Sequence, residues 1–246
     1  MIRAHIALLC AVLAAGCIDE PRLPDETQVF FSQGGRRAQV TMRDRGGFPD
    51  RVVDYEIVVV DPSGAQLSVR SDRAQVQSVS HQLSAHQLGS ELFIGLGDEL
   101  CVVHLSRRTA LWFAVREVGP HTSLTAARVE ALRWRAGDTS ADHHERARAA
   151  LALSWTEPAA ALVAFDQLSL GTGNELSIEV EGARARISGD ATFLAELRER
   201  VPSMRGMEVA GLTRACVPQL AEALAQWRVQ RRGPTTFLDD AEAHCR

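Results

Sequence analysis

Apolar and polar residues alternate through residues 27 to 118, which is the pattern of half-buried β-strands. The clearest case is Val52 to Val60, where every second residue from Val53 is apolar. Gly34-Gly35 is typical of a tight hairpin turn, and Asp61-Pro62-Ser63-Gly64 of a type I turn. The expected strands are Val29–Ser32, Ala38–Met42, Val52–Val60, Ala65–Arg70, Gln75–Leu83, Glu91–Leu96, Glu99–Leu105 and Thr109–Val118. So many short strands separated by turns predict an antiparallel β sandwich or a small barrel.

The pattern changes to helical spacing after Gly119-Pro120. Ser123 is expected to cap a helix that Gly137 ends, and a second helix is expected from Ala141 to Leu153. Pro158 suits the first turn of a third helix, which ends before Gly171. Later helices are expected after Asp190, through Leu220, Leu224 and Trp227, and through Phe237, Leu238 and Ala241.

Strands are also expected between these helices. Leu176, Ile178 and Val180 alternate, Glu181-Gly182 would turn, and residues 183–187 would return. Met207 to Leu212 would form a further short strand. The order helix, strand, strand, helix, strand over residues 158–212 resembles the BON domain of periplasmic and outer-membrane proteins. The matching residues are Ile178–Val180, Glu181-Gly182, Ile187–Gly189 and Gly206-Met207.

The BON resemblance implies association with envelope membranes or with other such domains. A generic α/β unit is the alternative interpretation of the same spacing. The expected fold class is therefore α+β, with an N-terminal antiparallel sandwich or small barrel followed by a helix-rich mixed α/β domain. The expected divisions are a leader (1–16), a tether (17–26), a β-rich domain (27–118) and a helical and mixed domain (119–246).

The first residues have the organisation of a secretory signal. A basic start at Arg3 precedes a short apolar run, Ile6 to Leu13, and then the small residues Ala14-Ala15-Gly16 before Cys17. The run is shorter than the roughly 20 apolar residues of a membrane span. Leu13-Ala14-Ala15-Gly16-Cys17 resembles the bacterial lipobox, with Ala14 standing where the family usually carries Leu. A merely secreted protein cut after Gly16 is the alternative.

The lipobox resemblance implies that Cys17 carries the several acyl chains of a bacterial lipoprotein, including palmitate. Each buried CH₂ contributes about 0.8 kcal/mol, so several chains anchor a protein stably. Ile18, rather than Asp, follows the cysteine, which favours sorting to the outer membrane, facing the periplasm. Residues 18–26 are polar and Pro-rich, which suits a stiff tether.

The charge composition bears on which classes of partner the protein could bind. The 27 basic residues are all Arg, and the formal net charge is −4, with acids and Arg interspersed. Binding of nucleic acid depends on a basic patch, so we expect no nucleic-acid partner. The expected partners are the membrane, through the anchor, and other envelope proteins.

Three cysteines remain after Cys10 and Cys17, in a compartment that permits disulfides. Cys216 would open one helix and Cys245 would end the next, and their midpoint falls in the connection Val229–Pro234. An antiparallel helix pair folded about this loop would join the two sulfurs, so we predict a disulfide between Cys216 and Cys245. Cys101, in an apolar strand, is expected to be buried and inert.

The sequence predicts no catalytic, cofactor-binding or metal-ligating residue. His81, His86, Cys101 and His104 have a spacing that superficially suits zinc, but odd separations place strand side chains on opposite faces. His143-His144-Glu145 lacks the second His of a His-Glu-x-x-His site.

Two functions remain open. The first is a non-enzymatic, lipid-anchored envelope protein that binds or scaffolds other components, which an exposed apolar patch would favour. The second is an envelope hydrolase with a dispersed active site, which a deep pocket of converging His, acidic and Arg side chains would favour.

Overall fold

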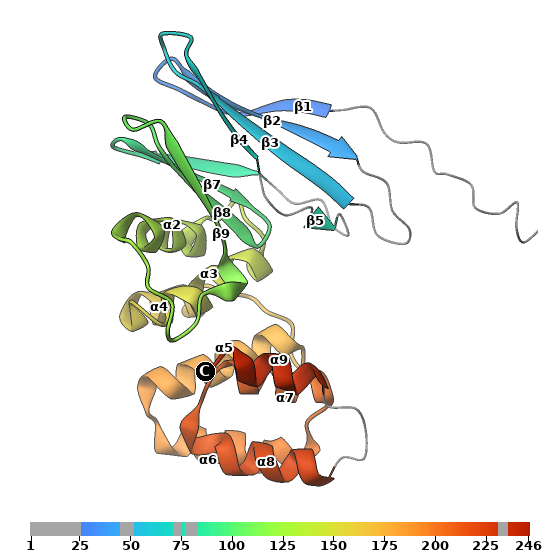
Figure 1. Ribbon diagram of the computed structural model, residues 1–246. Helices are drawn as coiled ribbons and strands as arrows, with labels where there is room; N and C mark the ends of the chain where they lie inside the picture. Colours follow the sequence, from blue (N-terminus) through green and yellow to red (C-terminus); the bar gives the residue numbers. More distant parts are fainter. Residues whose placement is uncertain (1–25, 45–51, 71–74, 77–82, 231–235) are drawn as a thin grey trace, which may run out of the picture. The chain divides into compact units, whose positions relative to one another are not determined.

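The computed structural model describes residues 26–44, 52–70, 75–76, 83–230 and 236–246. The chain divides into two compact units, residues 1–80 and residues 81–246, and each is considered by itself. Among the described residues, the first unit holds one antiparallel sheet, and the second holds another sheet and the helices (Figure 1).

The sheet of the first unit has the strand order β1-β2-β3-β4, and β5 also pairs with β3. Gly34 and Gly35 adopt φ values of 58° and 75° in the turn between β1 and β2, a conformation that glycine permits and that suits a tight hairpin. Tyr55, Ile57 and Val59 are buried along one face of β3, which confirms the predicted alternation. The strands are β1 (Glu26–Gln33), β2 (Arg36–Asp44), β3 (Val52–Val60), β4 (Gln66–Arg70) and β5 (Gln75–Val76).

The sheet of the second unit is an antiparallel meander in the order β6-β7-β8-β9. Its strands are β6 (Ser84–Leu88), β7 (Glu91–Leu96), β8 (Glu99–His104) and β9 (Thr109–Ala114). The predicted strand Thr109–Val118 ends early, because a short 3₁₀ turn, η1 (Val115–Glu117), follows Ala114. Neither sheet closes on itself, so the predicted barrel alternative is wrong, whereas the α+β class is confirmed.

Most helices begin and end near their predicted limits. Thr125, rather than Ser123, caps the first of them, and Asp142 caps the second by accepting the backbone N–H groups of His144 and Glu145. The helices are α2 (Ala126–Gly137), α3 (His143–Leu153), α4 (Pro158–Asp166), α5 (Glu175–Ser188), α6 (Ala191–Arg200), α7 (Gly206–Arg214), α8 (Ala221–Gln230) and α9 (Thr236–Ala243), with short 3₁₀ turns η2 (Val201–Ser203) and η3 (Pro218–Leu220).

The strands predicted at 176–187 and 207–212 are wrong, because these segments form α5 and α7. The described residues after η1 are therefore helical rather than mixed α/β, and the strand order that carried the BON resemblance is not present. The reason is that α5 is buried on two sides. One stripe of α5 packs in the cluster shared with α2, α3 and α4, and another packs in the cluster of α6–α9. The first stripe is Leu176, Val180, Ala183 and Ile187, and the second is Ile178 and Ala185.

Helices α5 and α7 cross at close range because both carry glycine at the crossing. A Cβ added to Gly211 would stand 2.1 Å from the carbonyl oxygen of Glu175, and one added to Gly182 would stand 2.5 Å from the Cβ of Ala215. Asn174 begins α5 with a capping box, and Gly189 ends it with a φ of 64°.

The sheet β6–β9 shares its core with the helices. Phe93, Leu100 and Val102 belong to the same buried cluster as Leu132 of α2 and Leu153 of α3, and Figure 1 shows α2 and α3 beside this sheet. The two compact units therefore divide between residues 80 and 81, whereas the change from strand to helix spacing predicted a boundary between residues 118 and 119.

Candidate functional site

A polar cavity of about 280 Å³ lies within the second unit. Its walls come from the turn between β7 and β8, from η1, from α3, α5, α7 and α9, and from the residues just after α3 and α9. Arginine, histidine and carboxylate side chains converge on it from these separate elements: Arg116, Arg148, Arg186, Arg214, His244, Asp98, Glu117, Glu179 and Asp240.

Arg186 of α5 is the most unusual of these side chains. Its guanidinium carbon lies 3.4 Å from the centre of the Trp155 ring, and its Nη2 donates a 2.8 Å hydrogen bond to Ser154 Oγ. Its Nε is buried without a hydrogen-bond partner. Burial lowers the pKa of Arg186 to about 10. Within the described ranges, no carboxylate lies at ion-pair distance from this guanidinium.

The other cations of the cavity lie close enough to affect one another. Burial lowers the pKa of Arg214, and the nearby Arg148 and Arg116 lower it further. Burial, Arg214 and Arg186 together lower the pKa of His244. Asp240 acts in the opposite direction and raises the pKa of Arg214. Arg148 pairs with Asp98 at 3.3 Å and Arg214 pairs with Glu175, so charges of both signs meet around the cavity.

Glu179 supplies a carboxyl group of a different kind. It is buried on α5, and burial raises its pKa to about 7, against the opposing effect of Arg148. The group therefore exchanges its proton near neutral pH, which is the property of a general acid or base.

A disulfide fixes the wall that α9 forms. Cys216 and Cys245 are joined, with their Cα atoms 5.6 Å apart. Cys216 lies in the turn after α7 with a φ of 51°, rather than opening α8, so the bond links the ends of α7 and α9. Cys245 directly follows His244 in the sequence, and both His244 and Asp240 of α9 line the cavity.

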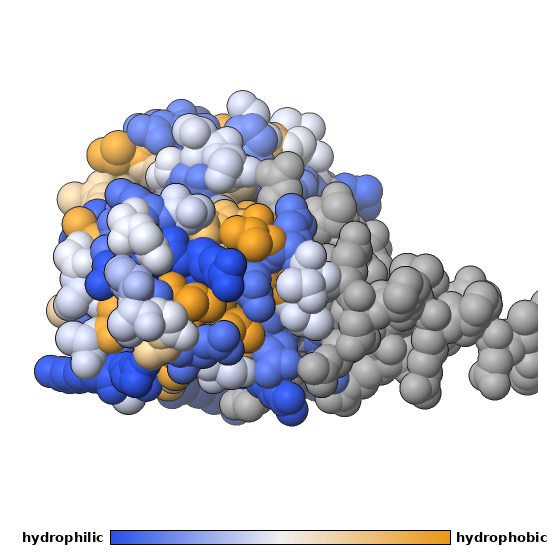
Figure 2. Space-filling model, turned by 90° about the horizontal axis from the view of Figure 1, so that it is seen from above, coloured by the Kyte–Doolittle hydropathy of each residue, from blue (hydrophilic) through white to orange (hydrophobic). Residues whose placement is uncertain are grey.

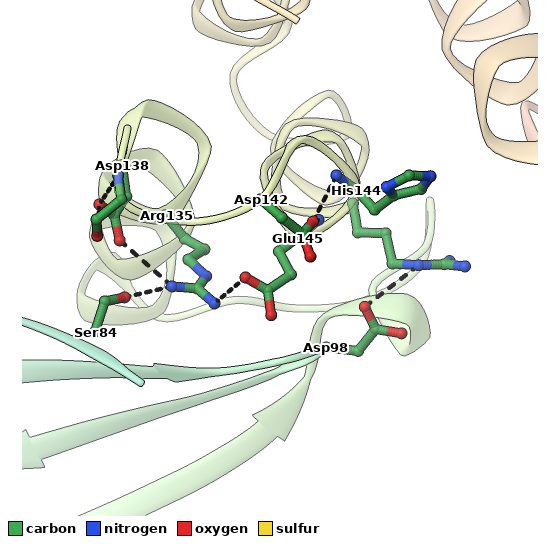
Figure 3. Close-up of polar contacts among 9 residues, drawn as sticks. Ser84, Asp98, Arg135, Asp138, Asp142, His144 and Glu145 are labelled. Atoms are coloured by element: carbon green, nitrogen blue, oxygen red, sulfur yellow. Dashed lines mark hydrogen bonds and ion pairs between the residues drawn. The ribbon is translucent and has the colours of Figure 1, made fainter. Parts of the chain in front are cut away.

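A second polar cluster surrounds the fully buried Arg135 of α2 (Figure 3). Its Nη2 donates a 2.7 Å bond to Glu145 Oε2, and its Nη1 donates to Ser84 Oγ and pairs with Asp138 at 3.4 Å. A Cβ on Gly95 would stand 2.6 Å from the guanidinium carbon. These contacts tie α2 and α3 to β6 and β7 and leave the guanidinium 1% exposed, so the cluster is structural.

The residues considered for zinc do not meet as a site. His81 lies outside the described residues, His86 stacks with Trp134, and His104 faces Glu91 at 3.2 Å. Cys101 is buried, and burial raises the pKa of its thiol to about 12, as expected of an inert cysteine. Over the described ranges, no group of three or more His, Cys, Asp or Glu side chains could hold a metal ion.

Comparison with known proteins identifies no relative. The chain matches no family model, no curated protein and no solved structure. Cys17 lies outside the described residues, and within the described part of the chain no helix has the length and hydropathy of a membrane span.

Exposed apolar side chains do not gather on one element. Figure 2 shows apolar residues lying among hydrophilic ones on the face in view. In the described part of the chain, the large exposed apolar residues come one each from β1, β6, β9, α4, α7 and α8: Val29, Leu88, Leu111, Val163, Met207 and Val229. The cavity is thus a better defined candidate than an apolar docking surface.

The cavity could not be predicted from the sequence because its residues are dispersed from 98 to 244. No short spacing links Arg148 of α3 to Glu179 and Arg186 of α5, since the relative placement of the two helices depends on tertiary packing. One local signal was present: Asn174 and Ser177 form a capping box, which predicts a helix and hence places Glu179 and Arg186 two turns apart on one face of it.

Proposed function

We propose that this protein is a lipid-anchored component of the bacterial cell envelope with a non-enzymatic binding role. The lipobox at Cys17 supports the anchor, most simply at the outer membrane and facing the periplasm. The observation that carries the binding role is the cavity of the second unit, where Arg, His and carboxylate side chains converge and where the buried Nε of Arg186 has no hydrogen-bond partner. Protein pockets with a few convergent polar groups are the usual sites of small ligands.

Binding is favoured over covalent catalysis by the state of the one serine hydroxyl that contacts Arg186. Ser154 Oγ donates its proton to the Leu151 carbonyl oxygen at 2.6 Å and accepts from Arg186. A nucleophilic serine instead donates to a base such as histidine. Ser154 is therefore arranged to orient the guanidinium rather than to attack a substrate.

An envelope hydrolase is the second candidate, and Glu179 is the specific observation that favours it. Its pKa of about 7 and its place beside Arg148, Arg186 and His244 would suit a general base that activates water. The cavity thus has the convergent His, acidic and Arg residues expected of a dispersed active site.

Two experiments test the anchor and the binding role. Metabolic labelling with a fatty-acid analogue is expected to label the wild type and not Cys17→Ser, whereas label on Cys17→Ser would refute the anchor. Affinity capture of the tagged lipoprotein from detergent-solubilised envelope, followed by mass spectrometry, is expected to recover reproducible envelope components. If the purified wild type hydrolyses cell-wall fragments and Glu179→Gln does not, the enzymatic alternative replaces the binding role.

A further inference from the structure

We propose that the cavity is a binding site for a small oxyanion, a carboxylate or phosphate group, held by the guanidinium of Arg186. The inference rests on the binding role proposed above and names the chemical class of its ligand. It is carried by the contacts of Arg186, by the grouping of cations around it, and by the size of the cavity.

The first observation is the contrast between Arg186 and its neighbour on α5. Arg184 pairs with Asp166 at 2.8 Å on the outside of the unit. Arg186 turns into the cavity, stacks on Trp155 and donates to the neutral Ser154 hydroxyl, with no carboxylate of the described residues within ion-pair distance. A half-buried guanidinium has five N–H donors, and these contacts leave donors available to a planar oxyanion.

The second observation is that further cations face the same space. Arg116, Arg148 and Arg214 line the cavity with Arg186. The acidic side chains of the lining are Asp98, Glu117, Glu179 and Asp240. Like charges in a shared, partly desolvated site repel one another, and an entering anion relieves that repulsion while gaining charge-assisted hydrogen bonds. Arg148 and Arg214 each pair with a carboxylate, Asp98 and Glu175, whereas Arg186 donates to a neutral hydroxyl and stacks on a ring, so its charge is available to a ligand.

The third observation concerns the size and lining of the site. A volume of about 280 Å³ lies just below the usual range for small-molecule pockets, so it admits a small metabolite or the charged end of a larger molecule. Leu151 and Ala183 supply an apolar part of the lining, against which a short carbon chain would pack.

The test is isothermal titration calorimetry of the purified full chain in detergent at pH 6, with inorganic phosphate and with succinate as separate probes. Ionic strength is held constant with sodium chloride, so that general screening does not change. We expect saturable binding of at least one anion. Phosphate binding alone would assign the site to a phosphoryl group, and succinate binding alone to a carboxylate. Absence of binding by both anions would overturn the proposal.

Arg186→Gln is expected to weaken binding about tenfold or more, because it removes the charge and the forked donors. Arg184→Gln is the matched control, since it removes a charge from the same helix outside the cavity, and it is expected to bind as the wild type does. Equal affinities of wild type and Arg186→Gln would overturn the assignment. If Arg186→Gln does not fold, Arg186→Lys is the second variant, because it keeps the positive charge but lacks the paired N–H donors of a guanidinium. It is expected to bind the anion more weakly than Arg184→Gln does. Equal affinities of these two variants would refute the role of the guanidinium.

The anchor and the anion site can fail separately. Label on Cys17→Ser would remove the proposed anchor and leave the calorimetry unaffected. Absence of anion binding would remove the oxyanion site and leave both the lipid labelling and the affinity capture as they stand.

Discussion

The buried carboxyl of Glu179 should make the stability of the second unit depend on pH, and Glu179→Gln should remove that dependence. The pKa of Glu179 is raised from an ordinary 4.5 to about 7 because burial disfavours the charged form. The folded state therefore holds a proton over a pH range in which the unfolded chain has released it. The stability that this proton contributes is fully present below pH 4.5 and is lost as the pH rises through about 7.

The magnitude follows from the two pKa values. At about 1.4 kcal/mol per pH unit, the interval from 4.5 to about 7 corresponds to about 3 kcal/mol of unfolding free energy. About 2 kcal/mol of this should be lost between pH 5.5 and pH 8.5. The glutamine side chain does not titrate, so the stability of Glu179→Gln minus that of the wild type should increase by about that amount over this range.

The assay is urea unfolding followed by tryptophan fluorescence from pH 5.5 to 8.5, in buffers free of phosphate and carboxylates. All four tryptophans lie in the second unit, so their emission reports that unit. Glu181→Gln is the control, because Glu181 lies on the same helix but pairs with Arg200 at the surface. Parallel pH profiles for the wild type and Glu179→Gln would refute the reasoning. The other titratable groups of the cavity are common to both proteins and cancel in the difference: Asp98, Arg116, Glu117, Arg148, Arg186, Arg214, Asp240 and His244.

Three further substitutions test the packing of the second unit by the same unfolding measurement. Gly211→Ala should destabilise by about 3 kcal/mol or more, since its Cβ would meet a backbone carbonyl of α5 at 2.1 Å; a loss below about 0.5 kcal/mol would contradict the close crossing. Replacing Cys216 and Cys245 together by Ser should lower the unfolding free energy by about 3.5 kcal/mol, which is the chain-entropy value for a separation of 29 residues. An unfolding midpoint equal to that of the oxidised wild type would contradict a stabilising disulfide. Glu145→Gln should destabilise by about 3 kcal/mol because it leaves the buried guanidinium of Arg135 without its closest carboxylate, and a neutral effect would show that the pair is dispensable.

The sequence predicted elements well where one face of an element is buried. Val52–Val60 is such a case, because every second side chain of this strand is buried on one face and the sequence shows that alternation directly. It failed at α5, where two buried stripes of a helix interleave. Leu176 and Val180 pack in one cluster and Ile178 packs in the other, so the apolar residues of the two stripes together have the every-second-residue spacing of a strand. Asn174 and Gly189 are typical residues at the start and end of a helix, and they predict α5 correctly. For a helix buried on both sides, such capping residues are a better guide than the spacing of apolar residues.

The cavity could be predicted only in its parts. The oxidisable pair Cys216 and Cys245 was predictable from spacing and compartment, although the helix that pairs with α9 is α7 rather than α8. The convergence of Arg148, Glu179 and Arg186 was not predictable, because their nearness depends on the crossing of α3, α5 and α7. That crossing is set by glycines whose role is visible only once their neighbours are placed.

The double burial of α5 has a consequence for the motions of the second unit. Because one helix completes both hydrophobic clusters, neither cluster can open without exposing part of the other, and the two should open as one cooperative block. Backbone amides of α5 should then exchange with solvent only through global opening and be among the slowest in the chain. The same helix carries Glu179 and Arg186, so a ligand seated on them would slow hydrogen exchange on both sides of α5 at once.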